Sequence, residues 1–134
     1  MNDELLVNYV IMRTDLESLN PGKAMAQSHH AFGALKHAVR SNLVMQPPYL
    51  SWQQQSDQDF GTCIVLGGTE GEINRALVYA RRIKASVVAG WVRDRTYPIR
   101  DGAVTHMVPL NTCAFVFGTK TDCEDIVRDF KLHE

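Results

Sequence analysis

The stretch "RTDLESLNPGKAMAQSHHAFGALKHAV", residues 13–39, contains the end of a strand, a turn and a long helix. Its Asn-Pro-Gly tripeptide is typical of a turn that leads into a helix, which we expect over residues 22–41. Alanines recur on one side of that helix, and small residues let a helix approach a sheet closely. This stretch therefore predicts a β-strand followed by a helix that packs on the same sheet.

A polar row runs along the same helix. Lys23, Gln27 and His30 are spaced at i, i+4 and i+7, so they share one face. Lys23 lies in the first turn, where the helix dipole is positive, and its ammonium would add to the free backbone N–H groups to form an anion site. A solvated lysine and a hydrogen-bonded packing histidine are the ordinary structural interpretations, and the row alone leaves both open.

The remaining apolar and amphipathic segments alternate along the chain. We expect strands over residues 5–13, 61–68, 86–94 and 112–118, and further helices over residues 69–85 and 121–132. Continuous apolar strands alternating with helices predict an α/β fold, here a three-layer α/β/α sandwich with a four-stranded mixed sheet and helices on both faces. No linker or internal repeat interrupts the chain, so residues 1–134 form a single predicted domain.

Two segments carry weaker signals. Residues 45–60 are polar and contain two prolines, which favours a loop with at most one short helical turn. Residues 95–111 read as irregular, with the Asp101-Gly102 pair able to close a small hairpin. Thr69 with Glu72, and Thr121 with Glu124, have the spacing of capping boxes that begin helices.

The composition is that of an ordinary soluble domain. The chain has 134 residues, a net charge of −1, 45% hydrophobic residues and 22% charged residues. No apolar run approaches the ~20 residues of a membrane helix, and the acidic start is unlike a signal peptide. These features predict a cytoplasmic protein without a membrane segment. The adjacent His29 and His30 point to different helix faces, so the sequence predicts no metal site.

Basic residues are concentrated in one part of the chain. Between Arg75 and Arg100 there are seven basic residues, and Asp94 is the single acid. A solvated helix face would explain the first of them, whereas a phosphate-binding edge would explain the whole run, and above all Arg93, Arg95 and Arg100.

The order of residues in "RTDL....PGKAMAQSHHA" resembles the N-terminal signature of the type II peptidyl-tRNA hydrolase family. In that family a strand ends in Arg-x-Asp-Leu, and a Gly-Lys pair opens a helix that reads Ala-x-Gln-x-x-His-Ala. The later segment "RDGAVTHMVPLNTCAFVFG" resembles the family's loop that runs into the last strand, and the similarity covers residues 8–118. The matching positions of the signature are Arg13, Asp15, Leu16, Gly22, Lys23, Ala26, Gln27, His30 and Ala31.

The resemblance implies hydrolysis of the ester that joins a peptide to tRNA, without a metal or cofactor, by a homodimer whose partner is peptidyl-tRNA. Two Arg-Asp pairs compete for the family's acidic position: Asp94 ends a predicted strand, and Asp101 precedes Thr105 by four residues in a region longer than the family's. The family's last-strand threonine falls on Cys113, and alternation would place Thr112 on the opposite face of the strand.

The resemblance also implies roles for these side chains. Lys23 would hold a phosphate or stabilise the oxyanion, and Asp94 or Asp101 would direct the attacking water, helped by desolvation that raises the carboxyl pKa. Thr105, or Thr96 in the other alignment, would donate a hydroxyl hydrogen bond. Gln27 and His30 would orient neighbours or contact the 3′ nucleotide. Arg93, Arg95 and Arg100 would bind phosphates.

Two other functions remain open. The altered region after Asp94 would also suit a non-catalytic member of the same fold that binds RNA or a protein. An enzyme of this fold that acts on another ester or amide is the third alternative.

Overall fold

The computed structural model describes residues 4–83 and 86–134. Its strands are β1 (Leu6–Arg13), β2 (Cys63–Gly68), β3 (Val88–Asp101), β4 (Val104–Thr119) and β5 (Lys131–Leu132), and its helices are α1 (Pro21–Val39), α2 (Gln46–Gln54), α3 (Glu70–Ile83) and α4 (Lys120–Val127). They form one mixed sheet in the order β3-β4-β1-β2-β5, in which β1 and β2 are parallel and the other pairs antiparallel. The predicted α/β class is confirmed, but the sheet has five strands rather than four.

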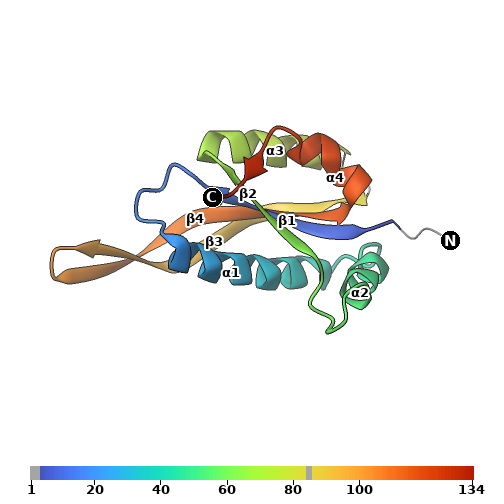
Figure 1. Ribbon diagram of the computed structural model, residues 1–134, viewed down its shortest axis with the longest axis horizontal. Coiled ribbons are helices and arrows are strands. Elements are labelled where there is room, and N and C mark those ends of the chain that lie inside the picture. Colours follow the sequence, from blue (N-terminus) through green and yellow to red (C-terminus); the bar gives the residue numbers. More distant parts are fainter. Residues whose placement is uncertain (1–3, 84–85) are drawn as a thin grey trace.

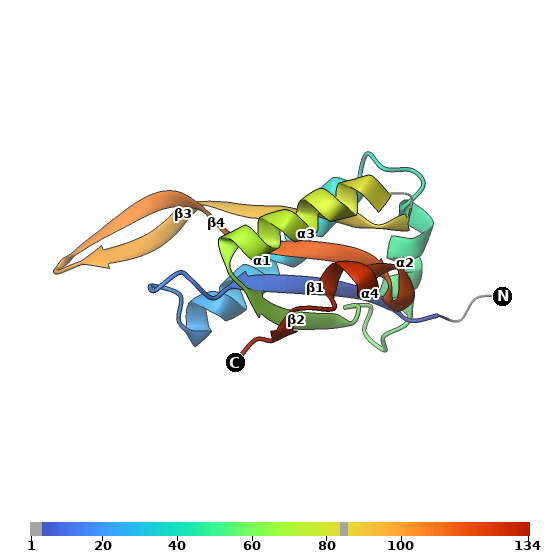
Figure 2. The ribbon, with the colours of Figure 1, turned by 90° about the horizontal axis from the view of Figure 1, so that it is seen from above.

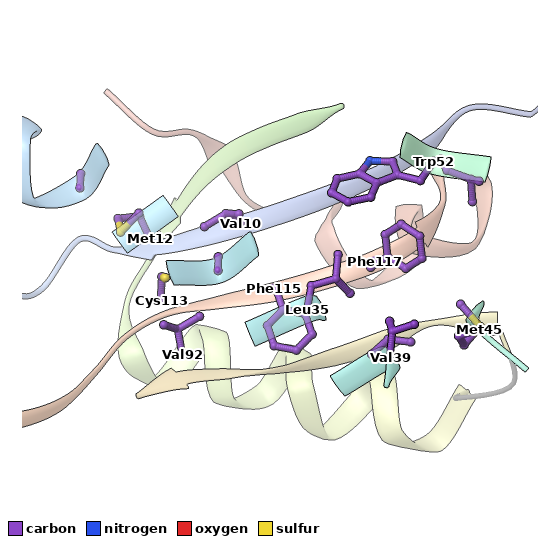
Figure 3. Close-up of a cluster of buried hydrophobic side chains, with 14 residues drawn as sticks. Val10, Met12, Leu35, Val39, Met45, Trp52, Val92, Cys113, Phe115 and Phe117 are labelled. Carbon is purple, nitrogen blue, oxygen red and sulfur yellow. The ribbon is translucent and has the colours of Figure 1, made fainter. Parts of the chain in front are cut away.

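The sheet is covered by helices on both faces (Figure 1). Val10 and Met12 of β1 pack in a core with α1 and α2, which Figure 3 shows in close-up. Tyr9 and Ile11 alternate with them and pack in a second core with α3 and α4. This alternation explains why β1 has no polar side, since each of its faces lies under a helix pair.

The helix starts follow local capping chemistry. Asn20 caps α1 by accepting a hydrogen bond from the Lys23 backbone N–H at 2.9 Å, with proline in the first turn. Thr69 and Glu72 form the predicted capping box, with reciprocal hydrogen bonds of 2.8 and 3.2 Å. The box predicted at Thr121 is wrong, because Thr119 caps α4 instead. The helix predicted over residues 69–85 is α3, and its predicted last residues, 84–85, lie outside the described residues.

The segment predicted as a loop over residues 45–60 contains the nine-residue helix α2. Its prolines lie in the first turn, where no intrahelical N–H donor is needed. Trp52 is 1% exposed, its ring packs against Phe32 and Phe117, and its indole N–H donates to the Thr62 carbonyl. Burial of the Trp52 side chain stabilises this helix. The polar residues around it in the sequence do not indicate that the segment is helical.

Residues 95–111, predicted to be irregular, continue β3 and β4 as a long hairpin. The turn is at Gly102, as the Asp-Gly pair predicts, with a backbone φ of 60° that suits glycine. Beyond the helices the hairpin projects from the body of the protein (Figure 2), and we call residues 95–110 the arm. Strand pairing along the arm, interrupted by one bulge near its base, replaces the expected loop, since the paired backbone groups bond to each other.

The final helix is shorter than predicted. It ends at Val127 rather than near residue 132, and Lys131 and Leu132 pair with Gly67 and Leu66 at the open edge of β2. This pairing supplies the fifth strand and protects an otherwise exposed sheet edge. Among the helices that the structure describes, none is long and apolar enough to cross a membrane.

Candidate active site

Asp94 lies on β3 with its side chain toward α1. Val88 and Val92 of the same strand belong to the α1 core, and Asp94 continues their alternation. Its side chain is 12% exposed, which is low for a carboxylate that faces a surface groove. The strand therefore presents one nearly buried carboxylate at the side of α1.

Gln27 connects this carboxylate to the next strand. Gln27 is 3% exposed, its Nε2 donates to Asp94 Oδ2 at 2.9 Å, and its Oε1 accepts from the Thr112 hydroxyl at 2.6 Å. Because an ionised carboxylate can only accept, the amide must turn its NH₂ group toward Asp94, and Thr112 must then be the donor. The chain of donors runs from Thr112 through Gln27 to Asp94.

The prediction that Thr112 and Cys113 point to opposite faces of the strand is wrong. The register passes from Val92–Cys113 to Arg93–Asn111, so Thr112 is an extra residue in a β-bulge. Cys113 lies close to the Gln27 carbonyl oxygen while Thr112 bonds to the Gln27 side chain, so both neighbours face α1. A bulge re-aims one side chain, and simple alternation along the strand fails here.

The second oxygen of Asp94 is held by Thr96, whose backbone N–H and hydroxyl both donate to Oδ1. Desolvation raises the pKa of Asp94, but the hydrogen bonds from Gln27 and Thr96 together outweigh it and lower the pKa below its ordinary value. We expected desolvation to raise this pKa, and that expectation is wrong because three donors stabilise the charged form. Asp94 is thus an ionised acceptor at neutral pH.

His30 and two arginines share a surface groove with Asp94. The His30 imidazole Nε2 lies 4.0 Å from Asp94 Oδ2, and its side chain is 48% exposed. The groove, of about 370 Å³, is bounded by α1 on one side and β3 on the other, with Arg93 and Arg95 on the strand side. A small molecule in this groove would meet an imidazole, a fixed carboxylate and two guanidinium groups.

Lys23 lies one helical turn before Gln27, about 6 Å along the same face. Its ammonium donates to the Pro98 carbonyl at 2.8 Å and lies 5.0 Å from the centroid of the Tyr97 ring. Tyr97 is fully buried and its hydroxyl bonds to Ser18. Lys23 therefore joins the start of α1 to the base of the arm, on the side of the sheet where Asp94 lies.

A second bulge brings Tyr97 to this face. Asp94 pairs with Leu110 and Tyr97 with Val108, so two residues of β3 oppose one of β4. Asp94 and Tyr97 are three positions apart yet both point toward α1. The two bulges together place groups from three positions of the hairpin against the polar row of α1.

The Arg13 and Asp15 pair of the signature has a structural position. Arg13 bonds to Asp15, Glu70 and the Asn111 carbonyl, and it thereby joins the end of β1 to the middle of β4 and the start of α3. Asp15 also accepts from the Glu70 backbone N–H, and the hydrogen bond from Arg13 is the main cause of its lowered pKa. These residues support the loop before α1, and they do not line the groove.

The structure does not bring Asp101 and Thr105 to this cluster. Asp101 is at the tip of the arm, its side chain is 84% exposed, and it lies 3.9 Å from His106. Thr105 pairs with Arg100 near the same tip. Of the two competing acidic residues, Asp94 contacts Gln27 and His30, whereas Asp101 contacts neither among the described residues.

Sequence reasoning missed Tyr97 and the Pro98 carbonyl, and it misplaced Thr112. Gln27 carried a usable signal, since it lies between the polar row and the buried alanines Ala24 and Ala31, where an amide requires hydrogen-bond partners. Nothing in the sequence marks the two bulges that supply those partners.

The pKa of Asp94 leads to a test that is independent of any activity. Because the folded value is lowered, ionised Asp94 stabilises the fold fully above its unfolded pKa, and that contribution is lost as the pH falls through the folded value. We expect an NMR titration of its carboxyl carbon to give a midpoint below the ordinary pKa of an aspartate, and Gln27→Met to raise that midpoint by removing a donor. Asp15, held by Arg13, is the internal control and should titrate alike in both proteins. A wild-type midpoint above the ordinary value would contradict this account.

Within residues 4–83 and 86–134, no three His, Cys, Asp or Glu side chains are grouped so that they could hold a metal ion. We compared the chain with models of known protein families and with curated proteins, and neither comparison gave a match.

Proposed function

We propose that this protein hydrolyses the ester bond between peptide and tRNA in peptidyl-tRNA and so releases reusable tRNA. The observation that carries the proposal is the Asp94 carboxylate, held by Gln27 in a groove beside His30, with Lys23 one turn away on the same helix. The residues that resemble the signature of the type II peptidyl-tRNA hydrolase family supply three of these four groups. The helix pairs on either face of the sheet fit the three-layer arrangement predicted from the alternation of strands and helices.

The reaction would use each group in a defined way. Ionised Asp94, whose two oxygens are held by Gln27 and Thr96, would orient a water molecule toward the ester carbonyl, with the adjacent imidazole of His30 as a second group able to accept a proton. Lys23 would exchange its bond to the Pro98 carbonyl for the developing oxyanion or a terminal phosphate. Arg93 and Arg95 at the groove would hold the phosphates of the 3′ end.

The same proposal places the protein in the cytoplasm as a homodimer, with peptidyl-tRNA as its partner. It requires no metal ion or cofactor, because water, a carboxylate and fixed cations suffice for hydrolysis of an activated ester.

Two observations favour a second candidate function, a non-catalytic protein of this fold that binds RNA. The Lys23 ammonium already has a backbone partner, and the lowered pKa of Asp94 makes that carboxylate a weak proton acceptor. An arginine-lined groove of this kind could hold an RNA end without cleaving it.

Release of tRNA from peptidyl-tRNA by the purified protein, in the presence of EDTA, tests the first function against the second. We expect multiple turnovers at an enzyme concentration well below that of the substrate. Binding of the same substrate without release, at micromolar protein, would establish the second function and reject the first.

Lys23→Ala should lower the rate of this hydrolysis by about 10²- to 10³-fold, since it removes a cation from the developing negative charge. Lys36→Ala is the matched control, because Lys36 is exposed in the last turn of the same helix and away from the groove. Circular dichroism should show both variants folded. A rate equal to that of the wild type in Lys23→Ala removes this lysine from the site.

A further inference from the structure

We propose that the arm binds the RNA backbone of the substrate's double-stranded stem, at a distance from the ester. This inference rests on the proposed function, because it assigns a second contact to the same substrate. It concerns a different part of the protein, so it can fail or hold separately.

The arm has the shape required for a remote contact. The arm extends past the N-terminal end of α1 and away from every helix in both ribbon views (Figures 1 and 2). Residues 101–107 are all exposed. Asp101 follows Asp94 by seven positions, which at about 3.3 Å per residue places the tip at most about 23 Å from the groove. That length corresponds to on the order of seven base pairs of a duplex.

Among the described residues, the arginines at the base of the arm and near its tip have no ion-pair partner. Arg93 and Arg95 stand where the arm meets the groove, and Arg100 lies near the tip. All three are exposed, and none forms an ion pair within the part of the chain that the structure describes. Free guanidinium groups along a strand are suited to phosphate oxygens, which they can bind through two parallel hydrogen bonds.

Asp101 does not cancel this charge. It is the only acidic residue between positions 95 and 111, and alternation along β3 directs it to the opposite face from Arg100. On its own face Asp101 lies near His106, whose strand partner is Ile99. The face with Arg100 and its partner Thr105 therefore presents a cation and a hydroxyl without a competing carboxylate.

A nucleic-acid duplex fits these features better than a protein does. Double-stranded RNA is bound mainly through its phosphates and 2′-hydroxyls, by groups that need reach and positive charge rather than an apolar pocket. A contact at the groove and a second one at most about 23 Å away would bind the 3′ end and the stem together. Affinity should then depend on the length of the stem, because a short stem cannot reach Arg100.

The test measures binding of fluorescent RNA hairpins with a single-stranded 3′ end, with stems of about 4 and about 12 base pairs. We expect the wild type to bind the longer hairpin about tenfold more tightly at moderate salt. The variant Arg100→Ala, which leaves the arginines of the groove in place, should lose this advantage, and the slope of log affinity against log salt should fall by about 1. The matched control Arg81→Ala removes one exposed arginine from α3 and should bind as the wild type does.

A shortened arm gives a second readout. Residues 99–106 are replaced by Asn-Gly, a two-residue turn that joins the paired residues Pro98 and Met107. This variant should bind both hairpins with the same affinity. In hydrolysis it should raise the KM for peptidyl-tRNA about tenfold, with kcat retained and with an unchanged rate on a peptidyl ester of a single nucleoside.

The outcomes separate the two proposals. If both arm variants keep the preference for the longer stem, the arm proposal is rejected, whatever the hydrolytic activity. An equal loss in the α3 control rejects it as well, because overall charge would then explain the binding. If the arm variants lose the preference while the wild type never releases tRNA, the arm proposal stands and the proposed function fails.

Discussion

We expect Asp94→Asn to lower the rate of peptidyl-tRNA hydrolysis by roughly 10²- to 10⁴-fold, the range typical for loss of a positioned general base. The substitution keeps the shape of the side chain and removes its charge. Gln27 and Thr96 would then face a neutral amide, and water in the groove would lose the negative oxygen that orients it. Single-turnover rates at saturating enzyme measure the chemical step without interference from product release.

Asp101→Asn is the matched control for this variant. It makes the same chemical change at the other Arg-Asp pair, at an exposed tip where the only described ionic neighbour is His106. We expect its rate to be within twofold of the wild type, a difference of about 0.4 kcal/mol in activation free energy. The reverse pattern, with Asp101→Asn inactive and Asp94→Asn active, would move the catalytic carboxylate to the arm. Full activity in both would exclude either residue.

The second large effect concerns the fold. Gly61→Ala should reduce the free energy of unfolding by about 2–5 kcal/mol, from about 1–2 kcal/mol for a left-handed residue and about 1–3 kcal/mol for overpacking. Gly61 has a φ of 76°, and a Cβ atom there would overlap the indole ring of Trp52. The ring cannot move away easily, because its N–H bonds to the Thr62 carbonyl and it packs edge-to-face with Phe117.

Gly102→Ala separates the two causes. Gly102 also has a positive φ, of 60°, but no atom lies within 4 Å of the position its Cβ would take. We expect this variant to lose only the conformational part, about 1–2 kcal/mol. Urea denaturation of both variants gives the comparison, with equal m-values as the check on two-state unfolding. Equal losses at the two sites would mean that contact with Trp52 contributes nothing at Gly61.

The predictable part of the site came from one helix. Lys23, Gln27 and His30 share a face because helical spacing requires it, whereas the sequence left Asp94 and Asp101 as alternatives for the carboxylate. Local chemistry also predicted the start of α1, the capping box at Thr69 and the turn at Gly102. Each of these depends on residues fewer than eight positions apart, and contacts at that range leave a pattern in the sequence.

The parts that could not be predicted depend on contacts distant in sequence. Thr112 reaches Gln27 across 85 positions only because β4 has a bulge, and the same strand without it would turn the hydroxyl away. The direction of the Asp94 pKa shift depends on hydrogen bonds from Gln27 and Thr96, and desolvation alone predicts the opposite sign. Helix α2 exists because Trp52 is buried against residues from α1 and β4.

The sequence by itself determined the α/β class, the polar row on the first long helix and the turn that closes the hairpin. Spacing and turn chemistry are local properties, and they are present in the chain before it folds. Only the tertiary structure decided which carboxylate meets that row, which hydroxyl supports it and how far the arm reaches. Those depend on strand register, and two single-residue bulges change which side chains face the helix.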